Sequence, residues 1–392
     1  MNVPKLRFKE FKDEWSTIEL YKISSEISYG MGLPSKEYDG INKYIRITDI
    51  DENTSKYTNK DIVSPDGELE DKYIVKKNDI LFARTGASTG KTYLYDKKDG
   101  KLYYAGFLIK ANIINHDANF IFQQTHTSKY NKWIKVMSMR SGQPGINSQE
   151  YGSYKFSITS KTEEYKISKT LQLLDKKIEL QSKKIKALKL FKKGLIDAEF
   201  TNSNYDEISL KNILKERKLY SEKGLEYPHV TLSKNGIYDK EERYNRDFLV
   251  KSEDKKYKIT HLNDLCYNPA NLKFGVICLN EYGSAIFSPI YVTFEINSIA
   301  NPKYIKYYTT RNNFINAIRK YEQGTVYERM AVAPEDFLKF NIKLPDIETQ
   351  NKIVLKLAKL DKKILLEENK LYKLQELKKG LMQKMFVWDL FY

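Results

Sequence analysis

Two stretches of the chain repeat one pattern of apolar positions, and this pattern predicts two long helices. Apolar side chains recur at alternating steps of four and three residues, which is the spacing of a coiled-coil seam. The predicted seam positions are Ile167, Leu171, Leu174, Ile178, Ile185 and Leu188 in the first stretch, and Ile353, Leu357, Leu360, Ile364, Leu371 and Leu374 in the second. Gln181 and Glu367 interrupt the seam at matching places, and a polar seam residue fixes register at some cost in stability.

The two stretches are copies of one sequence. Residues 162–200 and 348–386 align without gaps at an offset of 186 and share 16 identities in 39 positions, including LDKKI and KKGL in both copies. A helix of about 35 residues is roughly 50 Å long at a rise of 1.5 Å per residue. Independent amphipathic helices on separate domains remain an alternative. The two stretches, however, match in length, in the polar residue that interrupts the seam and in the KKGL string near the end, which favours helices that pair with each other.

The regions before the helices predict two mixed α/β domains. Short segments rich in Ile, Tyr, Val and Phe, bounded by Gly, Asn and Asp, are typical of strands. We expect strands at 43–47, 73–75, 79–83, 92–95 and 107–114, and at 229–232, 264–268, 275–279 and 289–296, with helices at 127–139 and 302–321. These regions also repeat weakly, because Asn78-Asp79-Ile80-Leu81 resembles Asn263-Asp264-Leu265-Cys266. The predicted organisation is a first domain over 1–160, a central helix over 161–200, a second domain over 201–345 and a C-terminal helix over 346–392.

Composition narrows the class of protein. The 392 residues include 67 Lys and Arg against 51 Asp and Glu, a net charge of +16. Such an excess favours a polyanionic partner, most often nucleic acid, although a generally basic proteome would give the same charge. The two cysteines form no CxxC pair, which excludes zinc ribbons and disulfide frameworks and suits a reducing compartment. The charged N-terminus and the absence of a long apolar run predict a cytoplasmic protein without a membrane span.

Three segments resemble catalytic motifs without fitting them. GASTGKT (86–92) has three residues between its glycines where a P-loop has four. YNPAN (267–271) lacks the second proline and the aromatic ring of an amino-methyltransferase loop. The carboxylates between Pro65 and Lys72 lie too close together in the chain for a nuclease set. We therefore expect no catalytic, cofactor-binding or metal-binding residues in this chain.

Several strings of residues resemble one protein family over essentially the whole chain. They are PKLRF (4–8) with Trp15, NDILFARTG (78–86), SGQPGIN (141–147) and the two LDKKI…KKGL helices. This chain resembles the DNA-specificity subunit of type I restriction–modification systems. The second half departs from the pattern, because Asn268 stands near the place of Arg84 and GTVYERM (324–330) replaces SGQPGIN.

The resemblance implies a scaffold without catalysis of its own. Each variable domain would be a target recognition domain that reads one half-site of a bipartite double-stranded DNA target with a non-specific spacer. The helices would pair as an antiparallel coiled coil and separate the domains, which places half-site centres about one helical turn, roughly 10 bp, apart. Two modification subunits would bind S-adenosylmethionine and methylate adenine, and restriction subunits would add ATP-driven translocation and Mg²⁺-dependent cleavage. This chain would hold none of these cofactors.

Two loops of the first domain are candidates for DNA contact. Arg84 can donate two hydrogen bonds to guanine, and Gln143 can read adenine. The side chains that suit phosphates are Thr85, Ser88, Thr89 and Lys91, and the second loop adds Arg140 and Ser141. The Arg84 loop is equally well explained as a hairpin turn with left-handed glycines, and Asn147 as the cap of a short helix. In the second domain we select Asn271, Lys273, Gln323, Thr325, Tyr327 and Arg329.

Two other functions remain open at this point. A stand-alone nucleic-acid-binding architectural protein could use the coiled coil to dimerise and would need no methyltransferase partner. A cryptic nuclease could use the carboxylates between Pro65 and Lys72 with Mg²⁺.

Overall fold

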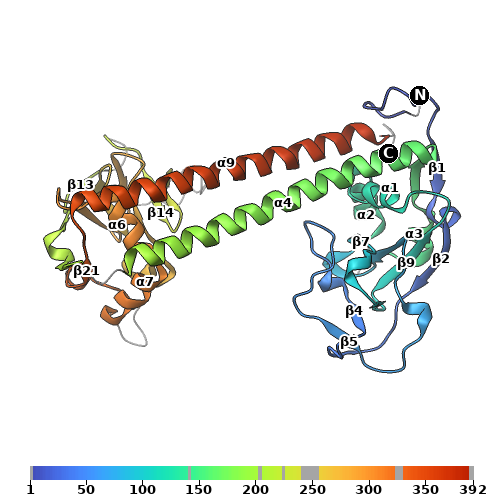
Figure 1. Cartoon of the computed structure of the whole chain (residues 1–392), viewed down its shortest axis with the longest axis horizontal. Helices are drawn as coiled ribbons and strands as arrows, with labels where there is room; N and C mark the ends of the chain where they lie inside the picture. The colour runs from blue at the N-terminus through green and yellow to red at the C-terminus, as the bar shows by residue number, and fades with distance from the viewer. Residues whose placement is uncertain are drawn as a thin grey trace. The chain divides into compact units, whose positions relative to one another are not determined.

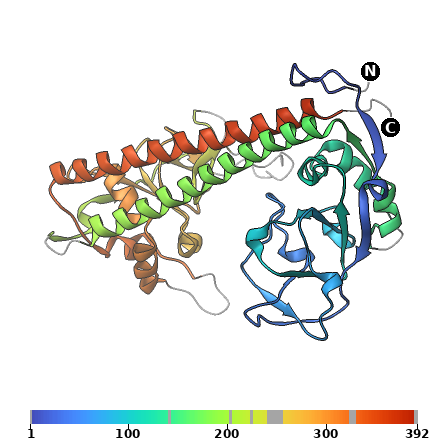
Figure 2. The ribbon, with the colours of Figure 1, turned by 45° about the vertical axis from the view of Figure 1, so that its right-hand side comes forward.

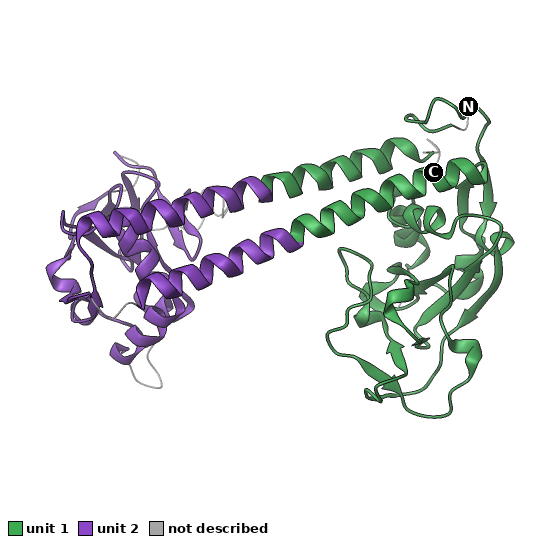
Figure 3. Ribbon diagram, in the orientation of Figure 1, with its two compact units in different colours: residues 1–182, 369–392 green, residues 183–368 purple. Residues whose placement is uncertain are grey.

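The computed structural model describes residues 3–139, 143–201, 205–222, 226–239, 256–322 and 330–387. The chain forms two compact units (Figure 3), the first from residues 1–182 and 369–392 and the second from residues 183–368. Each unit is a mixed α/β domain that includes part of two long helices, α4 (Lys161–Phe200) and α9 (Ile347–Met385). The expected mixed α/β fold with two long helices is confirmed.

The first unit is built around a four-stranded antiparallel sheet with the order β2, β9, β6, β7. These strands are β2 (Ser24–Tyr29), β9 (Leu108–Ile113), β6 (Asp79–Ala83) and β7 (Thr92–Leu94). Three further pairs are β1 (Ser16–Glu19) with β10 (Lys155–Ile158), β3 (Ser35–Glu37) with β5 (Val63–Pro65), and β4 (Lys43–Ile45) parallel to β8 (Leu102–Tyr104). The short helices are α1 (Ala118–Gln124), α2 (Ser128–Met137) and α3 (Ser148–Ser153).

Strand β6 is buried along its whole length because both faces of the sheet are covered. Side chains alternate between the two faces of a strand. Ile80 and Phe82 pack into one hydrophobic cluster, and Leu81 and Ala83 pack into another on the opposite face. The apolar run ILFA is therefore the signature of a central strand.

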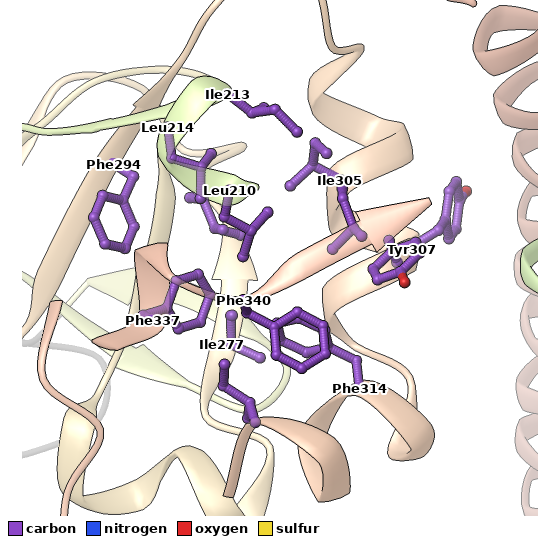
Figure 4. Packing of buried hydrophobic residues seen from close by; sticks show 14 of the residues in the cluster. Leu210, Ile213, Leu214, Ile277, Phe294, Ile305, Tyr307, Phe314, Phe337 and Phe340 are labelled. Atoms are coloured by element: carbon purple, nitrogen blue, oxygen red, sulfur yellow. The ribbon is translucent and has the colours of Figure 1, made fainter. Parts of the chain in front are cut away.

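The second unit repeats this architecture. Its four-stranded sheet has the order β12 (Leu214–Glu216), β20 (Val292–Ile296), β17 (Leu265–Tyr267), β18 (Ile277–Leu279). The other strands are β11 (Glu207–Ser209) with β21 (Asn341–Lys343), β13 (Tyr220–Ser221) with β16 (Tyr257–Thr260) and β19 (Ala285–Phe287), and β14 (Val230–Ser233) with β15 (Gly236–Asp239). Its helices are α6 (Pro302–Thr309), α7 (Asn312–Ile318) and α8 (Pro334–Leu338). Aromatic rings such as Phe294, Phe337 and Phe340 fill its core (Figure 4).

The weak repeat of the variable domains is confirmed by one turn that occurs in both units. Asn78 and Asn263 have positive φ angles of 71° and 69°. The next residue in each unit is a buried aspartate, and its side chain accepts a backbone N–H from three residues before, Lys76 in one unit and His261 in the other. Burial raises the pKa of the Asp79 carboxyl. Asn tolerates the left-handed backbone better than most residues. An Asn-Asp pair therefore stands at the start of the central strand in both units.

The two long helices run antiparallel within each unit (Figures 1 and 2). In the first unit, Ile167 and Leu171 near the start of α4 join the core together with Met382 and Met385 at the end of α9. In the second unit, Ile353 and Leu357 of α9 share a core with Phe200, the last residue of α4. All twelve predicted seam residues are buried or half-buried. At 40 and 39 residues the helices are longer than the predicted 35 or so.

Reciprocal ion pairs explain why LDKKI and KKGL recur in both copies. Asp175 of the first LDKKI contacts Lys378 of the second KKGL, with 2.6 Å between Oδ1 and Nζ. Asp361 of the second LDKKI contacts Lys192 of the first KKGL. When duplicated helices pair antiparallel, a contact between two positions occurs twice with the partners exchanged. The polar interruption is also paired, because buried Glu367 accepts a hydrogen bond from Lys184 at 2.9 Å.

Three predicted element bounds were wrong. Residues 71–73 form a short 3-10 turn, and Ile74 makes only an isolated bridge to Tyr103. The helix expected over 302–321 is broken into α6, α7 and a 3-10 turn at 319–321. The break coincides with Thr309 and Thr310, whose hydroxyls donate to carbonyls four residues before, a contact that competes with the helix ladder. The C-terminal helix ends at Met385, and residues 388–392 lie outside the described residues.

We expect the seam of α9 to carry much of the stability of the second unit. Leu357 is fully buried, whereas Leu355 on the same helix is 57% exposed. Leu357→Ala should lower the free energy of unfolding by about 2–5 kcal/mol, because it leaves a cavity. Leu355→Ala should change it by less than about 0.5 kcal/mol. Urea unfolding of the full chain followed by circular dichroism measures both, and an equal loss in the two variants would contradict this assignment.

Candidate nucleic-acid interface

The segment after β6 is a compact hairpin loop. A 3-10 turn at Gly86–Ser88 leads into β7, and Gly86 and Gly90 have positive φ angles of 71° and 93°. The backbone N–H groups of Gly86, Thr89, Gly90 and Lys91 all donate to carbonyls of this loop or its neighbours. The hairpin interpretation is confirmed, and these four amides bind carbonyls and not a phosphate. A strand follows where a P-loop would begin a helix.

Arg84 lies over an aromatic ring that sequence reasoning missed. Its guanidinium carbon is 4.7 Å from the centre of the Tyr29 ring, and Nη1 donates to the Gly106 carbonyl at 3.5 Å. The Tyr29 hydroxyl accepts the Ser148 N–H at 3.0 Å, which fixes the ring. Arg84 Nε is buried and makes no hydrogen bond to any described residue. Stacking of this kind holds a guanidinium in one orientation, so the half-buried Arg84 is positioned before any ligand arrives.

The structure joins the two predicted loops of the first domain into one surface. Gly86 donates its N–H to Pro144 O at 2.9 Å, and Ile146 donates to Arg84 O at 2.9 Å. A Cβ atom at Gly86 would lie 2.9 Å from Nε2 of Gln143, so the glycine lets Gln143 approach the hairpin. Arg140 and Ser141 lie outside the described residues. The alternative for Asn147 is confirmed, because its side chain caps α3 in a capping box with Glu150.

The predicted phosphate-binding side chains are only partly available. Lys91 Nζ is 2.7 Å from Oε1 of Glu52, and the lysine side chain is 21% exposed. Thr89 donates its hydroxyl to Gly86 O at 2.8 Å within the turn. Thr85 bridges to Gly145, and Ser88 is half-buried. Because an exposed ion pair contributes about 0–1 kcal/mol, a phosphate can replace Glu52 as the partner of Lys91 at little cost.

The second unit carries an equivalent loop of the same length. Ala83 donates to Lys91 O at 2.8 Å in the first unit, and Asn268 donates to Val276 O at 3.0 Å in the second. Each pair encloses seven residues, 84–90 and 269–275, and each loop ends on a left-handed glycine. By this hydrogen bonding, Pro269 is the equivalent of Arg84. The sequence alone places Asn268, one residue earlier, near that position.

The segment that crosses each loop is also equivalent in the two units. Val332 donates to Pro269 O at 3.3 Å, as Ile146 does to Arg84 O. The counterpart of Ile146 is therefore Val332, beyond the GTVYERM segment that the sequence comparison set against SGQPGIN. Gln323, Thr325, Tyr327 and Arg329 lie outside the described residues.

Of the residues selected in the second domain, the structure describes Asn271 and Lys273. Both lie in the 3-10 helix Pro269–Phe274, which Asn268 caps by accepting the N–H groups of Ala270 and Asn271. Asn271 is half-buried, Lys273 is exposed, and Phe274 beside them is 64% exposed. The YNPAN segment is therefore a helix start, with a polar and apolar surface that Asn271, Lys273 and Phe274 share.

The other candidate chemistries find no support in the described residues. Of the carboxylates considered for a nuclease, Asp66 pairs with Lys36 and Glu70 pairs with Lys72. Within the described ranges, no group of three or more His, Cys, Asp or Glu side chains could hold a metal ion. Cys266 and Cys278 are both buried without a disulfide, and burial raises the pKa of the Cys266 thiol to about 12. Among the residues placed in the structure, no helix is long and apolar enough to cross a bilayer.

Comparison with known proteins gives a match to one family model and similarity to solved structures. Residues 29–190 match the family model described as the type I restriction modification DNA specificity domain. The fold is similar to the crystal structure of the type I restriction-modification system S subunit from M. genitalium, with a TM-score of 0.61 and 13% identity over 99% of this chain and 100% of that one. A chain from a structural study of complex assembly and conformational transition in the type I R-M system has a TM-score of 0.56 and 14% identity, over 96% and 98% of the two chains.

Gly86 offers a test of the joined loops, with Gly40 as a matched control. Both glycines have positive φ, 71° and 86°, but a Cβ atom at Gly40 would meet nothing within 4 Å. Gly86→Ala and Gly40→Ala should each destabilise the chain by about 1–2 kcal/mol, because alanine is strained in this backbone region. Only Gly86→Ala should also displace Gln143 and weaken target DNA binding, by roughly 1 kcal/mol. Fluorescence anisotropy with labelled duplexes measures affinity, and equal binding by both variants would show that Gln143 plays no part.

Proposed function

Because residues 29–190 match the type I restriction modification DNA specificity domain and the whole fold is similar to an S subunit, we propose that this chain is a specificity subunit of such a system. It would read a bipartite DNA target, one half-site with each compact unit. The main support is the duplicated loop, which follows the same central strand in both units and has the same length. The side chains on the two loops differ, so the two half-sites should differ in sequence. The net charge of +16 favours binding to the phosphate backbone.

We further propose that catalysis belongs to partner subunits. Two modification subunits would bind S-adenosylmethionine and methylate adenine, and restriction subunits would use ATP and Mg²⁺ to translocate and cut DNA in the cytoplasm. In this chain four amides of the loop that resembles a phosphate-binding motif donate to carbonyls of that loop or its neighbours. Of the carboxylates near Pro65, Asp66 and Glu70 pair with lysines. Neither arrangement supports the nuclease alternative.

Equivalent exposed apolar residues on the long helices support two copies of one partner. Leu180 of α4 and Leu366 of α9 are identical in the repeat, although they are 56% and 52% exposed and lie outside the cores. Phe191 and Leu377 occupy a second equivalent pair and are 62% and 52% exposed. Paired exposed apolar residues are what two identical modification subunits would need. They favour an assembled complex over a stand-alone architectural protein.

Arg84 and Lys91 should differ in how they affect binding. With half-sites identified by methylation-sensitive sequencing of the host genome, Arg84→Ala should weaken recognition of one half-site by about 1–3 kcal/mol. Lys91→Ala should weaken binding to all DNA alike and lower the salt dependence by about one ion. Equal losses on target and scrambled duplexes for Arg84→Ala would reduce it to a phosphate contact or a turn residue.

The length of the two helices should set the spacer between half-sites. Seven residues inserted after Gln181 keep the seam in phase and lengthen α4 by about 10.5 Å, or about 3 bp of DNA at 3.4 Å per base pair. The half-site bases should stay the same while the spacer lengthens by up to that amount, or binding should fail.

A matched insertion after Glu367 should restore pairing and improve use of the longer spacer. Two inserted residues should be worse than seven, because they rotate the apolar stripe by about 200°. Methylated motifs in cells that carry each variant with its partner subunits are the measurement. A change of bases at a fixed spacer would contradict this role of the helices.

A further inference from the structure

Both units expose a large apolar side chain in the tight turn that leads into the strand beside the central strand. In the first unit, the turn Ala105–Leu108 is closed by the Leu108 N–H, which donates to Ala105 O at 2.8 Å. In the second, the turn Ser288–Tyr291 is closed by the Tyr291 N–H, which donates to Ser288 O at 3.1 Å. The third residue of the first turn is Phe107, 63% exposed, and that of the second is Ile290, 61% exposed.

Strand register shows that Phe107 and Ile290 occupy one position of the duplicated domain. The turns lead into β9 and β20, the strands that pair with the central strands β6 and β17. Ile80 is opposite Ala111, and its counterpart Leu265 is opposite Phe294. Phe107 precedes Ala111 by four residues and Ile290 precedes Phe294 by four. Both units therefore keep a large apolar residue at this place.

Folding does not account for these side chains. Gly, Asn, Asp and Ser dominate the central positions of tight turns because of their backbone preferences, and Phe107 and Ile290 belong to none of the buried clusters of the described residues. A single exposed apolar residue needs no explanation. Exposure at the same turn in both duplicated units, beside the proposed reading loop, does need an explanation.

The Phe107 turn is fixed directly to the loop that carries Arg84. Arg84 donates its N–H to Phe107 O at 3.0 Å, and its Nη1 donates to the neighbouring Gly106 O. The Gly106 N–H donates to Met31 O at 2.6 Å, which holds the turn from the other side. A base contact by Arg84 to guanine O6 and N7 is made in the major groove. Ala83 is opposite Leu108 in the pair of β6 and β9, so Phe107 lies next to Arg84 and we expect it to face the same groove.

We propose that Phe107 and Ile290 each pack against the C5-methyl group of a thymine in the half-site that their unit reads. This inference rests on the proposed function. The thymine methyl is the apolar group that the major groove presents, and apolar side chains read it by contact. A ring and a branched aliphatic chain both serve this purpose, which explains how Phe and Ile occupy one position. A wedge between base pairs acts from the minor groove, away from the guanine edge that Arg84 would read.

Replacement of thymine by deoxyuridine tests this contact, because it removes only the methyl group. Each thymine of both half-sites is replaced in turn, and duplex binding by the full-length chain is measured by anisotropy. One replacement in the first half-site should weaken wild-type binding about threefold to fivefold, the value of one buried methyl group. Phe107→Ala should weaken binding to the thymine duplex by at least as much and should no longer distinguish thymine from deoxyuridine there. Ile290→Ala should do the same for the second half-site alone.

Ile41→Ala is the matched control, since Ile41 is 68% exposed in the Asp39–Asn42 turn of the first unit. It should bind like wild type and keep the thymine preference, and Phe107→Leu should retain part of that preference.

The inference is overturned if no replacement weakens wild-type binding, if the thymine preference survives in Phe107→Ala, or if the first half-site contains no thymine on either strand. A 2-aminopurine signal of unstacking that depends on Phe107 would replace it with a wedge. If the wild-type chain binds target and scrambled duplexes alike, the proposed function itself has failed.

Discussion

Burial of the helix ends in the globular cores is the constraint on which the rest of this structure depends. Most helical stability in proteins comes from packing of an apolar face and not from intrinsic propensity. Ile167 and Leu171 are part of the first core, and Ile353 and Leu357 are part of the second. Each core therefore forms from a variable domain together with both helices. The compact units accordingly divide within the helices, between residues 182 and 183 and between 368 and 369.

The duplication also determines which polar residues of the two helices contact each other. The Asp of LDKKI meets the first Lys of KKGL from the other copy, once in each unit. In the second unit the Tyr307 hydroxyl also donates to Asp361 at 2.6 Å, and in the first unit Gln123 donates to Asp175 at 3.3 Å. Ion pairs on a partly exposed surface contribute little energy on their own. Their value lies in register, because a shifted helix would leave charges opposite apolar seam residues. This explains why the two strings are the best-preserved part of the repeat.

Sequence reasoning succeeded where the signal was local and periodic. The seam, the central strands and the hairpin at Gly86–Gly90 depend on spacings within a few residues, and the helix pairing depends on the repeat at an offset of 186. The structure contains all of them. The contact between Tyr29 and Arg84 depends on the neighbourhood of β2 and β6, which are separated by β9 in the sheet and distant in the chain. No local sequence pattern predicts this contact. The sequence predicts Phe107 as the first residue of a strand, whereas the strand begins at Leu108. Its exposure becomes informative only when strand register aligns Phe107 with Ile290.

The same duplication explains how one fold can read two different sequences. The backbone of the interface is kept, with a seven-residue loop, a terminal left-handed glycine and a crossing strand that donates to the first loop residue in both units. Side chains on this frame differ, and one difference is structural. Pro269 has no N–H, so the bond that ties Arg84 to the Phe107 turn has no counterpart at the Ile290 turn. The first unit therefore holds its candidate loop by a backbone hydrogen bond that the second unit lacks at the equivalent position. The side chains and local hydrogen bonds of the candidate interface thus differ between the two units, while the helix ends form part of the core in both.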